Sequence, residues 1–170
     1  MQPNDWPAVE QIYLEGIATG NATFETESPG WEKWNSAHHP DSRLIAKNGD
    51  SVIGWAALSA VSTRRVYAGV AEVSVYVAAS AQGKGIGKLL LTELIRQSEQ
   101  NGIWTLQAGI FPENAASIAL HESLGFHEVG RRMKIGQARG VSENCQRDCR
   151  LGDGPRIKPH LHGKADVSAR

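Results

Sequence analysis

A glycine-rich loop is the part of the sequence with the clearest capacity for chemistry. It runs through Gln82-Gly83-Lys84-Gly85-Ile86-Gly87, directly before an amphipathic stretch that predicts a helix. Backbone N–H groups point outward at a helix start and the helix dipole adds positive potential, so such a place suits a phosphate group. Glycine leaves room for the phosphate oxygens and allows positive φ. The loop predicts a phosphate site, with a plain strand-to-helix turn as the alternative.

Two familiar phosphate motifs do not fit this loop. A P-loop ends in Gly-Lys-Ser/Thr, whereas Gly87-Lys88 is followed by Leu89, which has no hydroxyl for magnesium. The dinucleotide fingerprint Gly-x-Gly-x-x-Gly also fails, because Lys88 or Leu90 stands where its third glycine is needed. Both motifs are therefore set aside.

The cysteines predict neither a disulfide framework nor a metal site. Cys145 and Cys149 are too few for a disulfide-rich secreted fold. With His160 and His162 nearby they still match no zinc spacing. We therefore expect no metal.

The loop must be held by a mixed α/β arrangement. Apolar spacing predicts helices over 5–20, 31–34, 86–95 and 114–124, with Asp5 and Asn114 as caps. Short runs of β-branched and aromatic residues predict strands over 43–47, 52–58, 72–77, 105–111 and 126–134. The pattern ends after Gly140. We therefore expect one domain over residues 1–140 and a poorly ordered tail over 141–170.

Composition narrows the class of protein. A chain of 170 residues suits one domain with a real core. Its 18 Lys plus Arg balance 18 Asp plus Glu, which argues against nucleic acid or an acidic membrane as a partner. No apolar run approaches the ~20 residues that span a bilayer, and Met1-Gln2-Pro3 begins no secretory signal. We expect a cytoplasmic protein.

With its flanks, the loop resembles the acyl-CoA signature of the GNAT superfamily of N-acetyltransferases, Gln/Arg-x-x-Gly-x-Gly/Ala. Residues 114–126 are similar to the superfamily's Asn-led helix that closes in Gly-Phe. Together with residues 22–26 and 72–77, these motifs resemble one branch of the superfamily, the phosphinothricin and methionine sulfone or sulfoximine N-acetyltransferases. This resemblance extends from about residue 4 to residue 140. The resemblance implies an α/β fold with a mixed, mostly antiparallel sheet, splayed at the cofactor site and covered by helices on both faces.

The resemblance also implies acetyl-CoA as co-substrate and assigns the residues that hold it. The strand edge pairs with pantetheine, the loop holds the pyrophosphate, and Asn114 binds the pantetheine arm or only caps its helix. The implied cofactor residues are Val75, Tyr76, Val77, Gln82, Gly83, Lys84, Gly85, Ile86, Gly87, Lys88, Asn114 and Ser117.

The resemblance also implies catalytic roles for Glu72 and His121. Glu72 resembles the branch's general base, acting through water, with a structural carboxylate as the alternative. His121 stands where many members carry a tyrosine that protonates the thiolate. It is expected either to donate a proton to sulfur or to help deprotonate the amine, and a structural histidine is the alternative.

Substrate recognition follows from the same resemblance. The segment Arg64-Arg65-Val66-Tyr67 is expected to meet an amino acid, with one arginine, left open, clamping its carboxylate. Phe24 and Glu25 are expected to shape the other wall. The implied reaction moves an acetyl group to the amine of a small amino acid or analogue. The alternatives are another amine (a protein N-terminus, a polyamine or an aminoglycoside) or a CoA-binding module without activity.

The two ends of the chain depart from the branch. The start leaves no room for the strand that normally precedes the first helix, and the segment after Gly140 lacks the branch's aromatic-x-Asp pattern. Our hypothesis for both departures is a truncated start and a shifted reading frame near Val141. We expect an exposed sheet edge and lower stability as a result. The resemblance further implies a homodimer.

Overall fold

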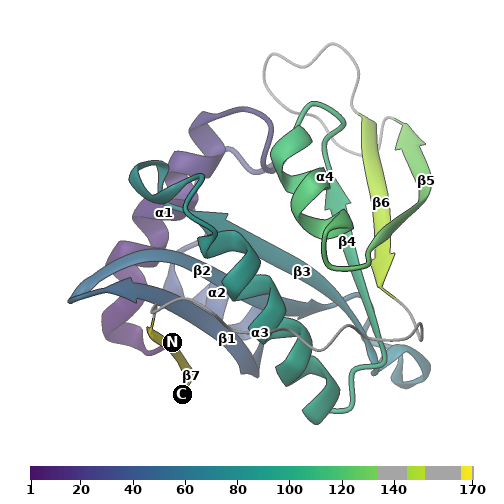
Figure 1. The fold of residues 1–170 in the computed structure, drawn as a ribbon. Coiled ribbons are helices and arrows are strands. Elements are labelled where there is room, and N and C mark those ends of the chain that lie inside the picture. The colour runs from purple at the N-terminus through teal and green to yellow at the C-terminus, as the bar shows by residue number, and fades with distance from the viewer. Residues whose placement is uncertain (134–144, 152–165, 170) are drawn as a thin grey trace.

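The computed structural model describes residues 1–133, 145–151 and 166–169. Their strands form one sheet in the order β5-β6-β4-β3-β2-β1-β7 (Figure 1). Only β3 and β4 pair in parallel within this described sheet, so the predicted mixed, mostly antiparallel sheet is confirmed. The strands are β1 (His38–Asn48), β2 (Ser51–Ala60), β3 (Val70–Val77), β4 (Thr105–Ile110), β5 (His127–Met133), β6 (Cys145–Leu151) and β7 (Asp166–Ala169).

Helices cover both faces of the sheet, as predicted. They are α1 (Trp6–Ala18), α2 (Trp31–Ala37), α3 (Ile86–Gln100) and α4 (Ala115–Glu122), with short 3₁₀ turns at Pro3–Asp5, Arg65–Tyr67 and Ala79–Ala81. Neighbouring residues of a strand face opposite ways. On β2, Trp55 meets Tyr13 of α1 and Trp34 of α2. Its neighbour Gly54 faces Leu90 of α3. No helix in the described part of the chain is long and apolar enough to cross a membrane.

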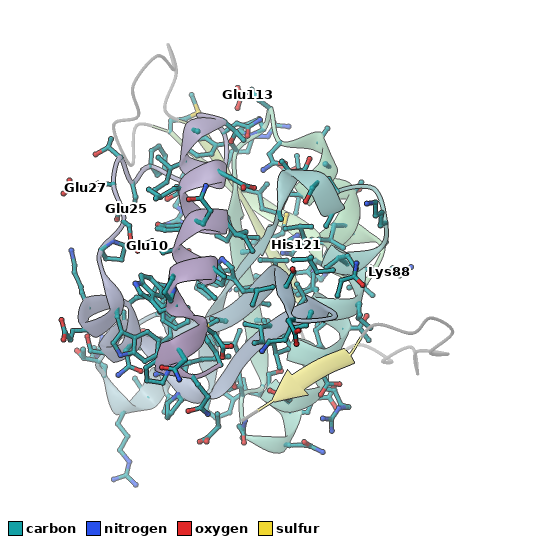
Figure 2. All side chains as sticks on the ribbon, turned by 90° about the vertical axis from the view of Figure 1, so that its left-hand side faces the viewer. Glu10, Glu25, Glu27, Lys88, Glu113 and His121 are labelled. Atoms are coloured by element: carbon teal, nitrogen blue, oxygen red, sulfur yellow. The ribbon has the colours of Figure 1, made fainter. Side chains whose placement is uncertain are left out.

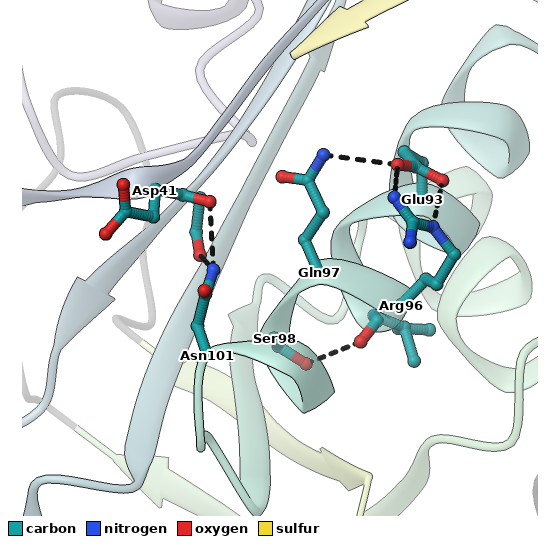
Figure 3. Close-up of polar contacts among 8 residues, drawn as sticks. Asp41, Glu93, Arg96, Gln97, Ser98 and Asn101 are labelled. Carbon is teal, nitrogen blue, oxygen red and sulfur yellow. Dashed lines mark hydrogen bonds and ion pairs between the residues drawn. The ribbon is translucent and has the colours of Figure 1, made fainter. Parts of the chain in front are cut away.

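Helix α3 is fixed at both its apolar face and its C-terminal end. Its inward residues Leu90, Leu91 and Leu94 are fully buried. At the far end the Asn101 amide donates to the Asp41 carbonyl at 3.0 Å, as Figure 3 shows together with the Arg96–Glu93 ion pair. Because the helix is held along its length, its N-terminus has a defined place beside the end of β3.

Of the two predicted helix caps, the one at Asn114 is present and the one at Asp5 is not. Asn114 caps α4, since its Oδ1 accepts the Ser117 N–H at 3.1 Å. Asp5 precedes α1 as expected, but its carboxylate makes no capping bond to that helix. It accepts the Gln2 N–H at 2.7 Å and pairs with Lys47 at 3.3 Å. Asp5 therefore ties the start of the chain to β1.

Part of the predicted poorly ordered tail is a strand of the sheet. Strand β6 lies between β4 and β5 and is antiparallel to both. The Cys149 side chain is buried, and Asp148 pairs with Arg132 of β5 at 2.7 Å, which gives this polar segment its place. Strand β4 is therefore no sheet edge, contrary to the expectation of a lost strand there. Strand β7 pairs with β1, and 141–144, 152–165 and 170 lie outside the described residues.

Candidate active site

The sheet divides at one place, between its two parallel strands. Strand β3 pairs with β2 as far as Val77, but it pairs with β4 only from Val70 to Glu72. Beyond Glu72 the two strands separate, and β4 continues as the partner of β6. The stretch of β3 after Glu72 therefore turns its free edge toward the opening.

A cleft of about 1130 Å³ occupies this opening. Its volume exceeds the roughly 300–1,000 Å³ typical of small-molecule sites, which leaves room for a cofactor and a second substrate together. Most of the predicted site residues line it, namely Phe24, Glu25, Glu72, Val75, Tyr76, Val77, Gln82, Gly83, Gly85, Ile86, Gly87, Lys88, Asn114, Ser117 and His121. The structure thus brings together residues that lie almost a hundred positions apart in the chain.

The glycine loop forms one end of the cleft. Gly83 and Gly85 have φ of 72° and 80°, a left-handed conformation that only glycine adopts freely. The first helical bond of α3 runs from the Leu89 N–H to the Gly85 carbonyl at 3.0 Å. The preceding amides therefore point off the helix start, where they favour an anion. Lys88 lines the cleft, whereas Lys84 does not and donates instead to the Ser80 carbonyl at 2.8 Å.

Glu72 stands at the point where the strands part. Its carboxylate accepts a hydrogen bond from the Gln107 amide of β4 at 3.2 Å. The same two residues form the last paired position between β3 and β4. Sequence reasoning missed Gln107, because the register that places it opposite Glu72 depends on a pairing between strands 35 residues apart.

His121 is a buried side chain with one free nitrogen. Its Nδ1 lies 2.8 Å from the Ser117 carbonyl, and a carbonyl only accepts, so Nδ1 carries the hydrogen. Its Nε2 is buried and has no hydrogen-bond partner among the described residues. Burial lowers the pKa of His121 below its ordinary value, although the Ser117 carbonyl opposes this. Near neutral pH the ring is therefore uncharged, with a lone pair on Nε2.

Asn114 joins the two sides of the cleft mouth. While Oδ1 caps α4, Nδ2 donates to the Asn21 carbonyl at 3.2 Å, in the loop after α1. The capping alternative for Asn114 is thus correct, and one amide hydrogen remains for a ligand. Whether that hydrogen binds pantetheine stays a prediction.

Aromatic side chains wall the cleft on the side of α1. The rings of Phe24 and Phe111 pack edge to face with their centroids 4.6 Å apart. The rings of Tyr13 and Tyr76 pack in the same way, with centroids 5.1 Å apart. The Tyr76 ring fits against α1 because position 16 is glycine, where a Cβ would lie 2.6 Å from the ring. This side therefore combines aromatic rings with polar side chains, among them Glu15, Thr19 and Glu25.

The predicted arginine segment lies apart from this group. None of the residues Arg64, Arg65, Val66 and Tyr67 lines the cleft. They precede the paired start of β3, at the closed end of the β3–β4 pair. The central carbon of the Arg64 guanidinium lies 5.5 Å from the centroid of the Tyr67 ring, and the Val66 side chain is 68% exposed.

Metal-ligating side chains do not gather in the described part of the chain. No group of three or more His, Cys, Asp or Glu residues there could hold an ion. Cys149 is buried. His160 and His162 lie outside the described residues.

A sheet that splits between its two parallel strands, with a helix start at one end of the split, offers an anion site beside a free strand edge, and this combination suits a ligand with phosphate and amide groups such as an acyl-CoA. The chain belongs to the acetyltransferase (GNAT) family, whose sequence profile matches residues 6–126. It is an N-acetyltransferase of this family.

Relatives named for these activities support the predicted branch. The phosphinothricin N-acetyltransferase of Alcaligenes faecalis is 32% identical over 143 residues, or 80% of this chain and 72% of the relative. The L-methionine sulfoximine/L-methionine sulfone acetyltransferase of Pseudomonas paraeruginosa is 32% identical over 143 residues, or 80% of this chain and 83% of the relative. A phosphinothricin acetyltransferase from Sinorhizobium meliloti, solved in complex with AcCoA, has a TM-score of 0.80 at 30% identity and covers 94% of this chain and 90% of that one. The resemblance to this branch is confirmed.

Proposed function

We propose that this protein transfers the acetyl group of acetyl-CoA to the amino group of a small amino acid or analogue, of the phosphinothricin or methionine sulfone and sulfoximine type. Relatives at 32% identity carry these activities in their names. The observation that carries the proposal is the position of Glu72, a carboxylate held at the apex of the split and open to the cleft.

The cleft fits acetyl-CoA by its chemistry. The amides from Gly83 to Lys88 suit the diphosphate, because they lie at a helix start in a loop whose glycines leave room for oxygen atoms. The free edge of Val75, Tyr76 and Val77 suits the pantetheine amides, which it would pair as a neighbouring strand does. When bound there, the cofactor supplies an activated acetyl thioester.

Glu72 then acts as general base. A protonated amine cannot attack a carbonyl, so its proton must leave before the N–C bond forms and the C–S bond breaks. The Glu72 carboxylate takes that proton, directly or through a water, while Gln107 orients it. Once the N–C bond has formed, the nitrogen loses a second proton, and the departing CoA thiolate takes up one proton to become the free thiol. Of the two protons lost by the amine, one is thus taken by Glu72 and one ends on sulfur. In this proposal, backbone N–H groups of Val73 to Val77 donate hydrogen bonds to the carbonyl oxygen.

His121 assists Glu72 in deprotonating the amine. Sequence reasoning left open whether it donates to sulfur or helps deprotonate the amine. A neutral ring with hydrogen on Nδ1 has only a lone pair to offer at Nε2, which favours the second role. Phe24 and Glu25 form a wall for the amine. The carboxylate clamp by Arg64 or Arg65 stays a prediction, as do the homodimer and the cytoplasmic location.

A substrate panel tests the proposal. Thiol release from acetyl-CoA is measured with methionine sulfone, phosphinothricin and spermidine, each with a no-amine control. We expect turnover with at least one of the two amino acids and little with spermidine. Turnover with spermidine alone assigns a polyamine-type substrate, and tight CoA binding without any turnover indicates a binding module.

A further inference from the structure

Charged side chains are distributed unevenly along the cleft. Among the described residues that line it, the carboxylates are Glu15, Glu25, Glu27 and Glu72, whereas the only lysines are Lys33 and Lys88 and there is no arginine. An ordinary site for anionic substrates has the opposite balance, with arginine or lysine facing the ligand.

One carboxylate and one lysine belong to the cofactor end. Glu15 accepts the N–H of Ala79, in the turn after β3, at 2.9 Å. Lys88 lies in the first turn of α3, beside the glycine loop. In Figure 2, Lys88 stands on the opposite side of the molecule from Glu25 and Glu27. These two charges are therefore directed at the phosphate end and roughly offset one another.

The amine end keeps an excess of negative charge. Glu25, Glu27 and Glu72 remain there against Lys33 alone. The histidines that line the cleft do not restore the balance. Burial lowers the pKa of His38, with a smaller opposing effect from the Trp34 carbonyl, and burial likewise lowers the pKa of His121. Both rings are thus neutral near pH 7 and add no positive charge.

The Glu25 charge acts inside the cleft although its side chain is exposed. Burial raises the pKa of the Tyr13 phenol, and the Glu25 carboxylate raises it further, against a hydrogen bond with Thr23. Burial also raises the pKa of Tyr76, with Tyr13 and Glu25 adding to it. The rings of these two tyrosines meet at 5.1 Å. The same carboxylate therefore influences two wall residues of the amine end.

Resting on the proposed function, we propose that this excess of carboxylates makes the enzyme select between acceptors of equal shape by their charge. Methionine sulfone and phosphinothricin form such a pair. Each has a methyl group and two oxygens on a second-row atom, two methylenes from the α-carbon, but the sulfone is neutral and the phosphinate carries one negative charge. The neutral sulfone is the better substrate.

The size of the preference follows from Coulomb's law. Two like charges about 6 Å apart in a water-like medium disfavour one another by about threefold in an equilibrium. Three carboxylates against one lysine leave a net excess of two, so if each charge acts from about that separation the expected preference in kcat/KM is about tenfold. Salt screens exposed charges, and the Debye length falls from about 10 Å at 0.1 M to about 3 Å at 1 M. The preference should therefore shrink toward unity at high salt.

Initial rates with the two substrates test this proposal on the full chain. The measured quantity is kcat/KM for methionine sulfone divided by that for phosphinothricin, at 0.05 M and 1 M salt. Glu25→Gln and Glu27→Gln are each expected to lower the ratio about threefold. Glu113→Gln is the matched control, because Glu113 is exposed, does not line the cleft and stands away from Glu25 in Figure 2. This control should leave the ratio unchanged.

The outcomes distinguish a failure of charge selection from a failure of the proposed activity. A ratio at or below one, or a high ratio that neither glutamate variant nor salt changes, overturns selection by charge while acetyl transfer to amino acids stands. Selection by charge in the cleft is also overturned if Glu113→Gln lowers the ratio as much as Glu25→Gln does, because the net charge of the whole protein would then be the cause. Failure to acetylate either substrate removes the proposed function and this inference together.

Discussion

Replacing Gly85 by alanine separates phosphate binding from stability. Gly85 has a φ of 80°, and a Cβ there would meet no atom within 4 Å. The cost of alanine is therefore backbone strain, about 1–2 kcal/mol for a left-handed residue, without a clash. To relieve that strain the loop moves out of the left-handed region and turns an amide away from the cleft. A hydrogen bond to a charged group contributes about 1.5–3 kcal/mol, so the Kd of CoA should rise about ten- to a hundredfold.

Gly49 provides a control with the same strain at a distance from the cleft. It lies in the β1–β2 hairpin with a φ of 59°, and its Cβ would also meet nothing within 4 Å. Gly49→Ala should lose a similar 1–2 kcal/mol of unfolding free energy while leaving the Kd unchanged. Urea unfolding and calorimetric titration with CoA measure the two quantities. If Gly85→Ala loses stability but binds CoA as tightly as Gly49→Ala, the loop does not hold the phosphates.

Three further predictions concern separate parts of the molecule. Glu72→Gln should lower kcat by about 10²-fold or more at an unchanged Kd for acetyl-CoA, and an unchanged kcat removes Glu72 as base. Because burial lowers the pKa of His121 and His38, the unfolded chain takes up protons at a higher pH than the folded one. The free energy of unfolding should therefore fall as the pH drops below about 6.5, and less steeply in His121→Asn than in a variant of the exposed His127. Equal slopes in the two variants contradict the buried neutral ring. Asn101→Ala breaks the bond to the Asp41 carbonyl and should cost about 1 kcal/mol in urea unfolding without affecting kcat; a lowered kcat means that the end of α3 also shapes the cleft.

Local patterns were sufficient to predict the elements around the cofactor end. The strand before the glycine loop, the amphipathic helix after it and the Asn114 cap are all present close to their predicted bounds. Each depends on interactions within about fifteen residues, such as a glycine that allows positive φ or a side chain that caps the next turn. Sequence carries such information directly.

Features that depend on pairing between distant segments were not predictable. The sequence of β6 is polar, and the pairs that hold it, such as Asp148 with Arg132, arise only once β5 lies beside it. Gln107 looks like any strand residue until the parallel register sets it against Glu72. The position of the arginine segment depends on the same register. It precedes β3 and lies at the end where β3 and β4 are still paired, apart from the residues that line the cleft.

The identity of the acetylated product is the decisive evidence for acetyl transfer to an amine at the split of the sheet. The protein is incubated with acetyl-CoA and methionine sulfone, and the product is examined by mass spectrometry and NMR, beside a reaction with Glu72→Gln. We predict one equivalent of free CoA thiol for each N-acetylated amino acid, and a strongly reduced yield of both with Glu72→Gln. Thiol release without an N-acetyl product, or an equal yield from the variant, would contradict acetyl transfer to the amine at the split of the sheet.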